Sequence, residues 1–303
     1  MTEAALEQSL YLDHNGTTPI ASEAISAMMP FLEEHFGNPS SAHWYGQQTR
    51  KGLDTARQRV ADFLGCSPEE VVFTSGGSEA NNYAIMGAAR ARRDQGNHII
   101  TSAVEHPAVL EVVLALEIEG KVSLTIIGVD RFGRVDPKAV ANALRDDTVL
   151  VSLMLANNEV GTLQPVAEVA ALCCERGVAV HTDAAQAVGK IPVDVGDLGV
   201  DLLSVAGHKL YAPKGVGALY VRRGVRLEKL IHGADHEQNL RAGTENVAFI
   251  VGLARACELA AEHRDQESVI SRLNADISEA RQTLAVAEAR LRDATARKHR
   301  LEE

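Results

Sequence analysis

The segment SVAGHKLYAPKGVGALYV, Ser204–Val221, contains two apolar runs joined by a short loop. Each run has the length and the aliphatic residues of a buried strand, and so short a loop favours antiparallel pairing of the two strands. Lys209 stands in this loop, directly after Gly-His. Because lysine is almost never buried without a partner, its place between two buried strands makes it a candidate functional residue rather than a surface charge.

Upstream of this segment, short apolar runs alternate with helix-length amphipathic segments. Strands separated by helices need crossover connections, which indicate a largely parallel sheet covered on both faces. The antiparallel pair within Ser204–Val221 makes the sheet mixed. The sequence therefore predicts an α/β fold with a mostly parallel mixed sheet and helices on both faces. The upstream runs are EVVFTS, HIITSA, TVLVSLML and VAVHTDA.

The composition changes near residue 262. The stretch 262–303 contains no Gly or Pro and is rich in Ala, Glu and Arg. Apolar residues recur there at alternating spacings of four and three from Leu273 to Ala294, which predicts a long C-terminal helix with a weak heptad seam. The predicted domains are an N-terminal arm over 1–15, a large domain over 16–261 and a helical tail over 262–303.

Bulk composition excludes several classes of protein. The 303 residues are 46% hydrophobic with a formal net charge of −11, which fits a globular protein and argues against a nucleic-acid partner. No apolar run approaches the roughly 18 residues of a membrane span, and the N-terminus lacks a signal-peptide pattern. Four cysteines without metal-like spacing predict a reducing, cytoplasmic location, no metal site and packed thiols at Cys173 and Cys174.

Polar residues follow most of the predicted strands directly. Gly76 and Gly77 turn one strand into a helix that begins near Ser78, and a helix N-terminus with close-approaching backbone is a ready anion site, although a capped turn gives the same pattern. In an open α/β sheet, ligands bind beyond the carboxyl ends of the strands. The residues expected to gather there are Gly76, Ser78, His106, Asn158, Asp183, Gln186 and Lys209.

Pyridoxal 5'-phosphate (PLP) is a cofactor that needs such a set. It requires a lysine for its Schiff base, an acid opposite its ring nitrogen, a planar group against its ring, a donor near its phenolic oxygen and an anion site for its phosphate. Asp183 at a buried strand end is costly unless a cation pairs with it, and a protonated ring nitrogen is such a cation.

A series of motifs, in order from about residue 10 to residue 260, resembles those of cysteine desulfurases within the class V aminotransferase group of fold-type I PLP enzymes. The motifs are YLDHNGTTP, FGNPSSAH, VFTSGGSEANN, EHPAVL, NNEVGTLQPV, HTDAAQAVGK, GHKLYAPKGVGALYVRR and RAGTEN.

The resemblance implies a role for each candidate residue. Lys209 is the Schiff-base lysine, Asp183 the partner of the ring nitrogen, and His106 the stacked ring and a proton carrier. The remaining cofactor contacts are Gly77, Ser78 and His208 at the phosphate, Gln186 at the phenolic oxygen, Asn158 near the ring hydroxyl and the substrate carboxylate, and Thr244, which reaches the phosphate of a neighbouring subunit.

The resemblance also implies an activity and partners. The implied activity is formation of a cysteine–PLP aldimine for sulfur transfer, leaving alanine and a persulfide and serving iron–sulfur cluster assembly or a related route. The implied substrate is L-cysteine or a related amino acid, the implied assembly is a homodimer, and a sulfur-acceptor protein is a further partner.

Three departures from the family pattern qualify this expectation. Ala206 stands where the family has a phosphate-binding serine, the segment IHGADHEQNL replaces a Gly-rich one, and no segment matches the small domain with its nucleophilic cysteine loop and carboxylate-binding arginine. Two functions remain open: a desulfurase-like enzyme whose cysteine loop is supplied separately, and a catalytically incomplete PLP-binding protein that recruits a partner through its tail helix. A gene fragment with an unrelated tail is a third reading.

Overall fold

The computed structural model describes residues 10–266 together with residues 270, 273, 278 and 281. The chain divides into two compact units, Met1–Glu258 and Leu259–Glu303. In the second unit the described residues are all helical. Of the heptad positions predicted for the tail only Leu273 is described, so the seam itself lies outside the described residues, as do the first nine residues of the predicted arm.

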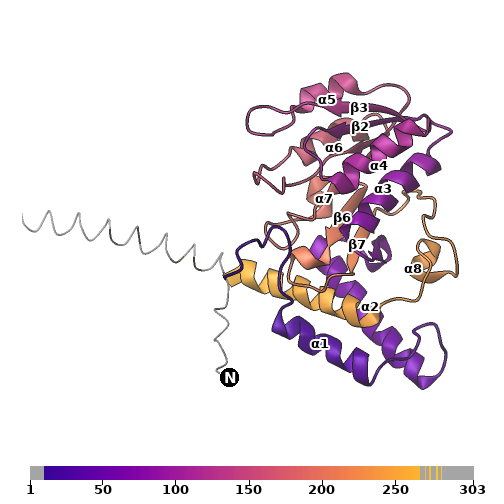
Figure 1. Ribbon diagram of the computed structural model, residues 1–303, viewed down its shortest axis with the longest axis vertical. Helices are drawn as coiled ribbons and strands as arrows, with labels where there is room; N and C mark the ends of the chain where they lie inside the picture. Colours follow the sequence, from indigo (N-terminus) through magenta and orange to yellow (C-terminus); the bar gives the residue numbers. More distant parts are fainter. Residues whose placement is uncertain (1–9, 267–269, 271–272, 274–277, 279–280, 282–303) are drawn as a thin grey trace, which may run out of the picture. The chain divides into compact units, whose positions relative to one another are not determined.

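The first unit contains a seven-stranded sheet with the strand order β1-β7-β6-β5-β4-β2-β3 (Figure 1). The four pairings from β6 to β3 are parallel, whereas β7 pairs antiparallel with both β6 and β1. This arrangement confirms the predicted mostly parallel mixed sheet. The strands are β1 (Val71–Thr74), β2 (His98–Ser102), β3 (Ser123–Ile127), β4 (Thr148–Ser152), β5 (Ala179–Asp183), β6 (Leu202–Ala206) and β7 (Gly217–Val221).

The two strands of the segment Ser204–Val221 pair as expected. Their register runs from Leu202 opposite Val221 to Ala206 opposite Gly217. β3 is a strand that the sequence analysis did not predict. It lies at the sheet edge and is mostly half-buried, so its residues lack the continuous apolar run that marks the central strands.

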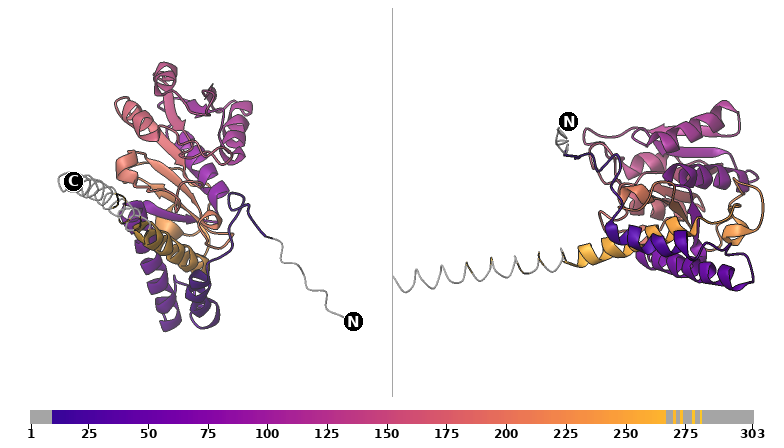
Figure 2. Two further views of the ribbon diagram at one scale, coloured as in Figure 1. Left: turned by 90° about the vertical axis from the view of Figure 1, so that its left-hand side faces the viewer. Right: turned by 60° about the horizontal axis from the view of Figure 1, so that its bottom comes forward.

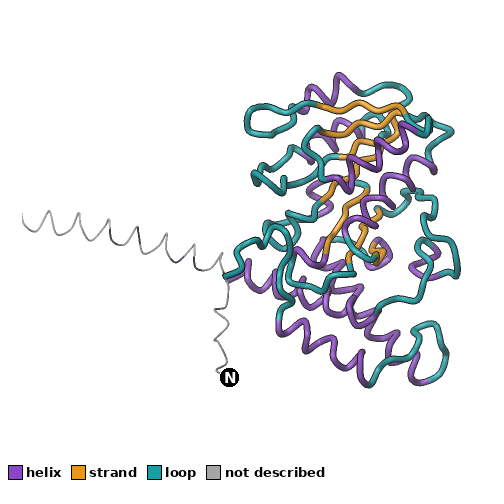
Figure 3. Tube along the Cα trace, in the orientation of Figure 1, coloured by secondary structure: helices purple, strands orange, loops and turns teal. Residues whose placement is uncertain are grey.

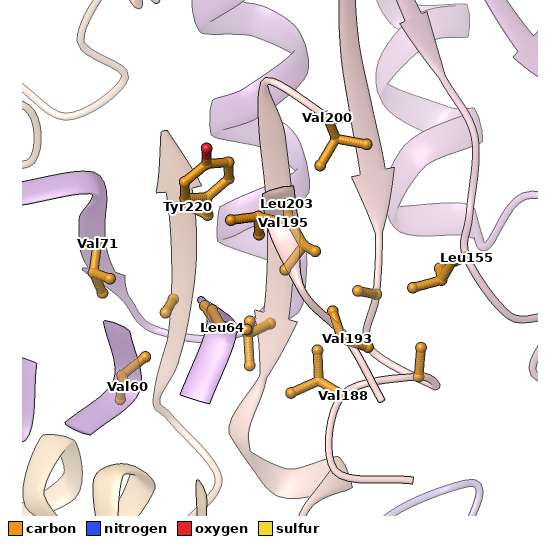
Figure 4. Packing of buried hydrophobic residues seen from close by; sticks show 14 of the residues in the cluster. Val60, Leu64, Val71, Leu155, Val188, Val193, Val195, Val200, Leu203 and Tyr220 are labelled. Atoms are coloured by element: carbon orange, nitrogen blue, oxygen red, sulfur yellow. The ribbon is translucent and has the colours of Figure 1, made fainter. Parts of the chain in front are cut away.

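Two helix layers cover the sheet (Figures 1 and 2). Neighbouring residues along a strand face opposite layers. Leu202 packs on the side of α3 (Gly77–Ala91) and α4 (Pro107–Ile118), and Leu203 packs on the side of α2 (Trp44–Leu64) and α6 (Val166–Cys174). Figure 4 shows part of the second layer, where Val60 and Leu64 of α2 lie near Val71 and Leu203 of the sheet. A sheet that is buried on both faces requires near-continuous apolar strands, as observed.

The helices of the described chain include those of the two layers and several shorter ones. The α-helices are α1 (Ser22–Glu33), α2 (Trp44–Leu64), α3 (Gly77–Ala91), α4 (Pro107–Ile118), α5 (Pro137–Ala143), α6 (Val166–Cys174) and α7 (Val195–Leu198), and the 3-10 helices are η1 (Pro68–Glu70) and η2 (Gly207–Lys209). The segment labelled α8 (His236–Asn239) is a short turn with positive φ at residues 237–239. Residues 247–266 are also helical. Among the described residues, no helix is long and apolar enough to cross a bilayer.

Candidate functional site

The loops that follow the strands surround a cavity of about 560 Å³ (Figure 3 shows these loops in teal). Eight of the nine predicted site residues line it: Gly77, Ser78, His106, Asn158, Asp183, Gln186, His208 and Lys209. Thr244 is exposed and does not line this cavity. Its role was expected at the phosphate of a neighbouring subunit, so that role stays a prediction.

Lys209 enters the cavity from η2, directly after β6. Its Nζ donates hydrogen bonds to the backbone oxygens of Asn15 and Gly16, the latter at 3.0 Å. Partial burial lowers the pKa of Lys209, against the opposing effect of the carboxylates of Asp13 and Asp183. The amine is therefore closer to its neutral, nucleophilic form than a surface lysine is.

The segment around Thr17 lines the cavity and is hydrogen-bonded to His208, the residue before Lys209. Thr17 Oγ1 lies 3.1 Å from His208 Nδ1, and Thr18 Oγ1 donates to the backbone oxygen of His208 at 3.0 Å. Together with the bonds from Lys209, these contacts place the end of the predicted N-terminal arm at the cavity, whose lining includes Gly16 and Thr17.

Asp183 is the last residue of β5 and is 5% exposed. Its Oδ2 accepts a 2.7 Å hydrogen bond from Asn81 Nδ2, and its Oδ1 accepts one of 2.9 Å from the backbone N–H of Ala185. Burial raises the pKa of Asp183 above its ordinary value. No ion pair between described residues includes it. A buried carboxylate that lines a cavity without a salt bridge fits a cationic group of a ligand, as a protonated ring nitrogen would be.

The turn between β1 and α3 has the geometry of an anion site. Gly76 has φ +146°, a conformation that favours glycine, and a Cβ on Gly77 would lie 3.0 Å from the Cβ of Ala206. The turn therefore favours glycine at both positions, and the 15-residue α3 begins at the cavity lining, where the unpaired N–H groups of a helix N-terminus attract an anion. Ser78 adds a hydroxyl there, whereas Ala206 contributes only a methyl group.

The other predicted residues hold defined orientations. His106 is the N-cap of α4, and its Nδ1 accepts a 3.1 Å hydrogen bond from the backbone N–H of Ala108, which fixes the exposed ring. Asn158 Nδ2 donates to Glu159 Oε1 at 2.6 Å. Gln186 Nε2 donates to the backbone oxygen of Asn15 at 3.1 Å, and Gln186 Oε1 accepts from Lys190 Nζ.

Four residues at or beside the site escaped the sequence analysis: Asn81 and Glu79, which line the cavity, and Lys190 and Glu105, which do not. Asn81 is 1% exposed, lines the cavity and leaves its Oδ1 without a partner. Its signal was an apolar-face position three residues after Ser78 on a predicted helix. Lys190 follows Gln186 by four residues and gave no signal of its own, because an exposed lysine is ordinary.

Glu105 is a buried carboxyl next to the site. It accepts hydrogen bonds from Ser102 Oγ at 2.6 Å and from the backbone N–H of Met154 at 2.9 Å. Burial raises the pKa of Glu105 to about 8, with a smaller contribution from the charge of Asp183. The sequence alone gave no reason to expect a buried acid beside His106.

All four cysteines lie in the described part of the chain, and none lines the cavity. Cys173 is buried, as predicted, but Cys174 is exposed because the two adjacent residues face different sides of α6. Burial raises the pKa of both Cys66 and Cys173 to about 12, so these thiols are poor nucleophiles. Among the described residues no cluster of His, Cys, Asp and Glu has the arrangement of a metal site.

Comparison with known proteins agrees with this geometry. The family model described as aminotransferase class-V matches residues 10–299. Over 262 residues the chain is 52% identical to "Cysteine desulfurase IscS" of Dictyoglomus turgidum, covering 86% of this chain and 66% of that protein. It is 46% identical over 266 residues to "Cysteine desulfurase" of Mus musculus, covering 87% and 58%.

Solved structures give the same result. A "NIFS-LIKE PROTEIN" matches with a TM-score of 0.82 at 41% identity, covering 85% of this chain and 71% of that one. A structure titled "SspA in complex with cysteine" matches with a TM-score of 0.80 at 39% identity, covering 87% and 78%. The chain spans 62–66% of the length of the first three curated relatives. The chain belongs to the class V aminotransferase family of PLP-dependent enzymes, and its relatives in that family are cysteine desulfurases.

Proposed function

We propose that the protein binds PLP at the cavity beside the N-terminus of α3 and acts on the α-carbon of L-cysteine or a related amino acid. In this proposal it is a cysteine desulfurase-like enzyme that works as a cytoplasmic homodimer. The observation that supports this most directly is that Lys209, with a lowered pKa, and the unpaired buried carboxylate of Asp183 line one cavity with the N-terminus of α3. A lysine nucleophile, an acid and an anion site are three of the five requirements of this cofactor.

The residues present fit the cofactor. Gly77, Ser78 and His208 would hold its phosphate, Asp183 its ring nitrogen, Gln186 its phenolic oxygen, and His106 would lie against its ring. When bound, PLP would supply an electron-withdrawing ring that stabilises negative charge at the substrate α-carbon. The unpaired Oδ1 of Asn81 is one more polar atom that the cavity offers to a ligand.

Lys209 would have two tasks. Its amine would hold the cofactor as the lysine nucleophile of the site, and when free it would act as the base that takes the proton from the substrate α-carbon. The carbonyl oxygens of Asn15 and Gly16 are hydrogen-bond acceptors for an ammonium group at this position. They would stabilise the protonated form of Lys209 after that proton transfer.

Sulfur transfer needs a thiolate that reaches the substrate. Because none of the four cysteines lines the cavity, we propose that this thiolate comes from another polypeptide or segment, and that a sulfur-acceptor protein is the partner. The same observation favours the second candidate function, in which this chain binds PLP and the amino acid without completing sulfur transfer.

The test is exchange of the substrate α-proton, which requires no sulfur acceptor. Purified protein is expected to show the visible absorption band of lysine-bound PLP and to exchange the α-proton of L-cysteine for deuterium in D2O, followed by NMR. Lys209→Ala is expected to lose both, and Lys214→Ala, another lysine at the same cavity, to keep both. Protein that takes up no PLP contradicts the proposal; alanine in the reaction shows complete turnover, and binding of L-cysteine without exchange supports the second candidate.

A further inference from the structure

An ion pair stands directly beside the anion site and has no role in the function proposed above. Glu79 is on the first turn of α3 and lines the cavity. Its Oε1 accepts a 2.9 Å hydrogen bond from Arg241 Nε, its Oε2 one of 3.3 Å from Arg241 Nη2, and its Oε2 a further one of 2.8 Å from the backbone N–H of Ser75. Arg241 itself is not part of the cavity lining.

This pair is largely withdrawn from solvent. The side chains of Arg241 and Glu79 are 21% and 12% exposed. Although burial opposes ionisation, the hydrogen bonds from Arg241 and Ser75 hold the pKa of Glu79 below its ordinary value, so the carboxylate is charged. A charged carboxylate at a cavity that binds an anion repels the ligand unless a cation cancels it.

The loop that supplies Arg241 is held firmly in place. Tyr83 Oη donates to the backbone oxygen of Leu240 at 2.5 Å. Arg57 makes a bidentate ion pair with Glu237, with both N···O distances 2.7 Å and side chains 10% and 2% exposed. Glu237 also accepts a 2.7 Å hydrogen bond from the backbone N–H of Phe73, in the strand that leads into the anion turn.

The backbone of this loop is strained, which makes its anchoring significant. Glu237, Gln238 and Asn239 have φ values of +48°, +54° and +65°, a left-handed conformation that non-glycine residues seldom adopt in succession. Such a conformation persists only where the surrounding contacts determine it. The buried Arg57–Glu237 pair provides those contacts and sets the position of Arg241 two residues beyond the strained turn.

We propose that Arg241 is a positioning residue of the anion site: its ion pair with Glu79 cancels a negative charge beside the Ser75–Ser78 turn, and so admits the phosphate group of PLP. The inference rests on the proposed function, because the phosphate is that of the proposed cofactor.

The test compares two probes that differ only in the phosphate, PLP and pyridoxal, titrated into the full chain freed of cofactor. Arg241→Gln is expected to weaken PLP binding by at least about tenfold, because the carboxylate of Glu79 then stands uncompensated beside the phosphate. Binding of pyridoxal, which uses Lys209 but not the anion site, is expected to stay unchanged. Arg93→Gln is the matched control, because it breaks the exposed Arg93–Glu228 pair away from the cavity.

Replacing Glu79, the partner of Arg241, distinguishes an effect of charge from a loss of local structure. Glu79→Gln leaves the cation of Arg241 uncompensated, so we expect it to bind PLP at least as tightly as the wild type, whereas loss of a structural strut weakens binding in both single variants. The double variant Glu79→Gln/Arg241→Gln is expected to recover most of the affinity lost in Arg241→Gln. If Arg241→Gln does not fold, Glu79→Gln and the double variant still show whether removing the charge of Glu79 strengthens or weakens PLP binding.

Three results overturn the inference, provided that the wild type binds PLP. They are PLP binding by Arg241→Gln that equals that of the wild type, an equal loss of affinity for PLP and for pyridoxal in Arg241→Gln, and weaker PLP binding by Glu79→Gln. A wild type that binds neither probe overturns the proposed function as well, so the two failures are distinguishable.

Discussion

Asn81 and Asp183 are joined by a 2.7 Å hydrogen bond that ties the buried face of α3 to the carboxyl end of β5. The helix that begins at the anion turn and the strand that ends at the acid are therefore positioned together. Both side chains are buried and both line the cavity, so the bond fixes the acid relative to the anion site.

Replacing Asn81 tests this relationship. Asn81→Ala removes a donor from a buried carboxylate, and we expect it to lower the free energy of unfolding by about 1–3 kcal/mol. Urea denaturation measures the change. Asn82→Ala is the matched control, because its Nδ2 donates only to the backbone oxygen of Ser78 at the surface, and a loss within about 0.5 kcal/mol is expected. Equal losses in the two variants would contradict the assignment.

Glu105 predicts a pH dependence of stability. Its pKa is raised from 4.5 to about 8 in the folded protein, so between these values the folded state keeps a proton that the unfolded state releases. The contribution of Glu105 to stability is therefore fully present below about pH 4.5 and is lost as the pH rises, by up to about 1.4 kcal/mol per pH unit.

Glu105→Gln isolates this contribution, because glutamine keeps the shape of the neutral acid and does not titrate. The free energy of unfolding of the variant, relative to that of the wild type, is expected to increase steadily from pH 5 to pH 8, the window set by these pKa values. Urea denaturation at several pH values gives the difference. A difference that is constant with pH would show that Glu105 does not hold a proton in the folded state.

The buried ion pair of Arg57 and Glu237 predicts a large effect on stability. Removing one member of a buried pair leaves the other charge uncompensated, so Arg57→Ala is expected to cost about 3–5 kcal/mol in the free energy of unfolding. Arg50→Ala, which breaks an exposed pair with Asp54 on the same helix, is expected to cost less than about 1 kcal/mol. Thermal or urea unfolding of both variants tests the contrast, and similar costs refute it.

Lys190 predicts a spectroscopic effect on the bound cofactor. Its amine donates to the Oε1 of Gln186, which fixes the Nε2 of that amide as the end that donates hydrogen bonds, here to the backbone oxygen of Asn15. In Lys190→Met this orientation is no longer enforced, and a weaker hydrogen bond to the phenolic oxygen of PLP raises the pH at which the visible band titrates by roughly one unit. Gln186→Ala is expected to shift it at least as much, and Lys190→Arg to restore it.

The sequence by itself determined the fold class, because each buried strand is recognisable as an apolar run even when the strands that pair with it are unknown. The antiparallel pair of Leu202–Ala206 with Gly217–Val221 follows from loop length alone. The residues at strand ends were also readable, since the carboxyl ends of parallel strands meet at one edge. Eight of the nine predicted site residues line one cavity for that reason.

Tertiary structure decided everything that depends on residues distant in sequence. The edge strand β3 is recognised by its pairing with β2 rather than by its half-polar residues. Asn81 meets Asp183 across 102 positions, and Arg241 meets Glu79 across 162. A lone asparagine or arginine in a sequence has no preferred partner, because the energy of a hydrogen bond depends on distance and burial that only the folded chain supplies.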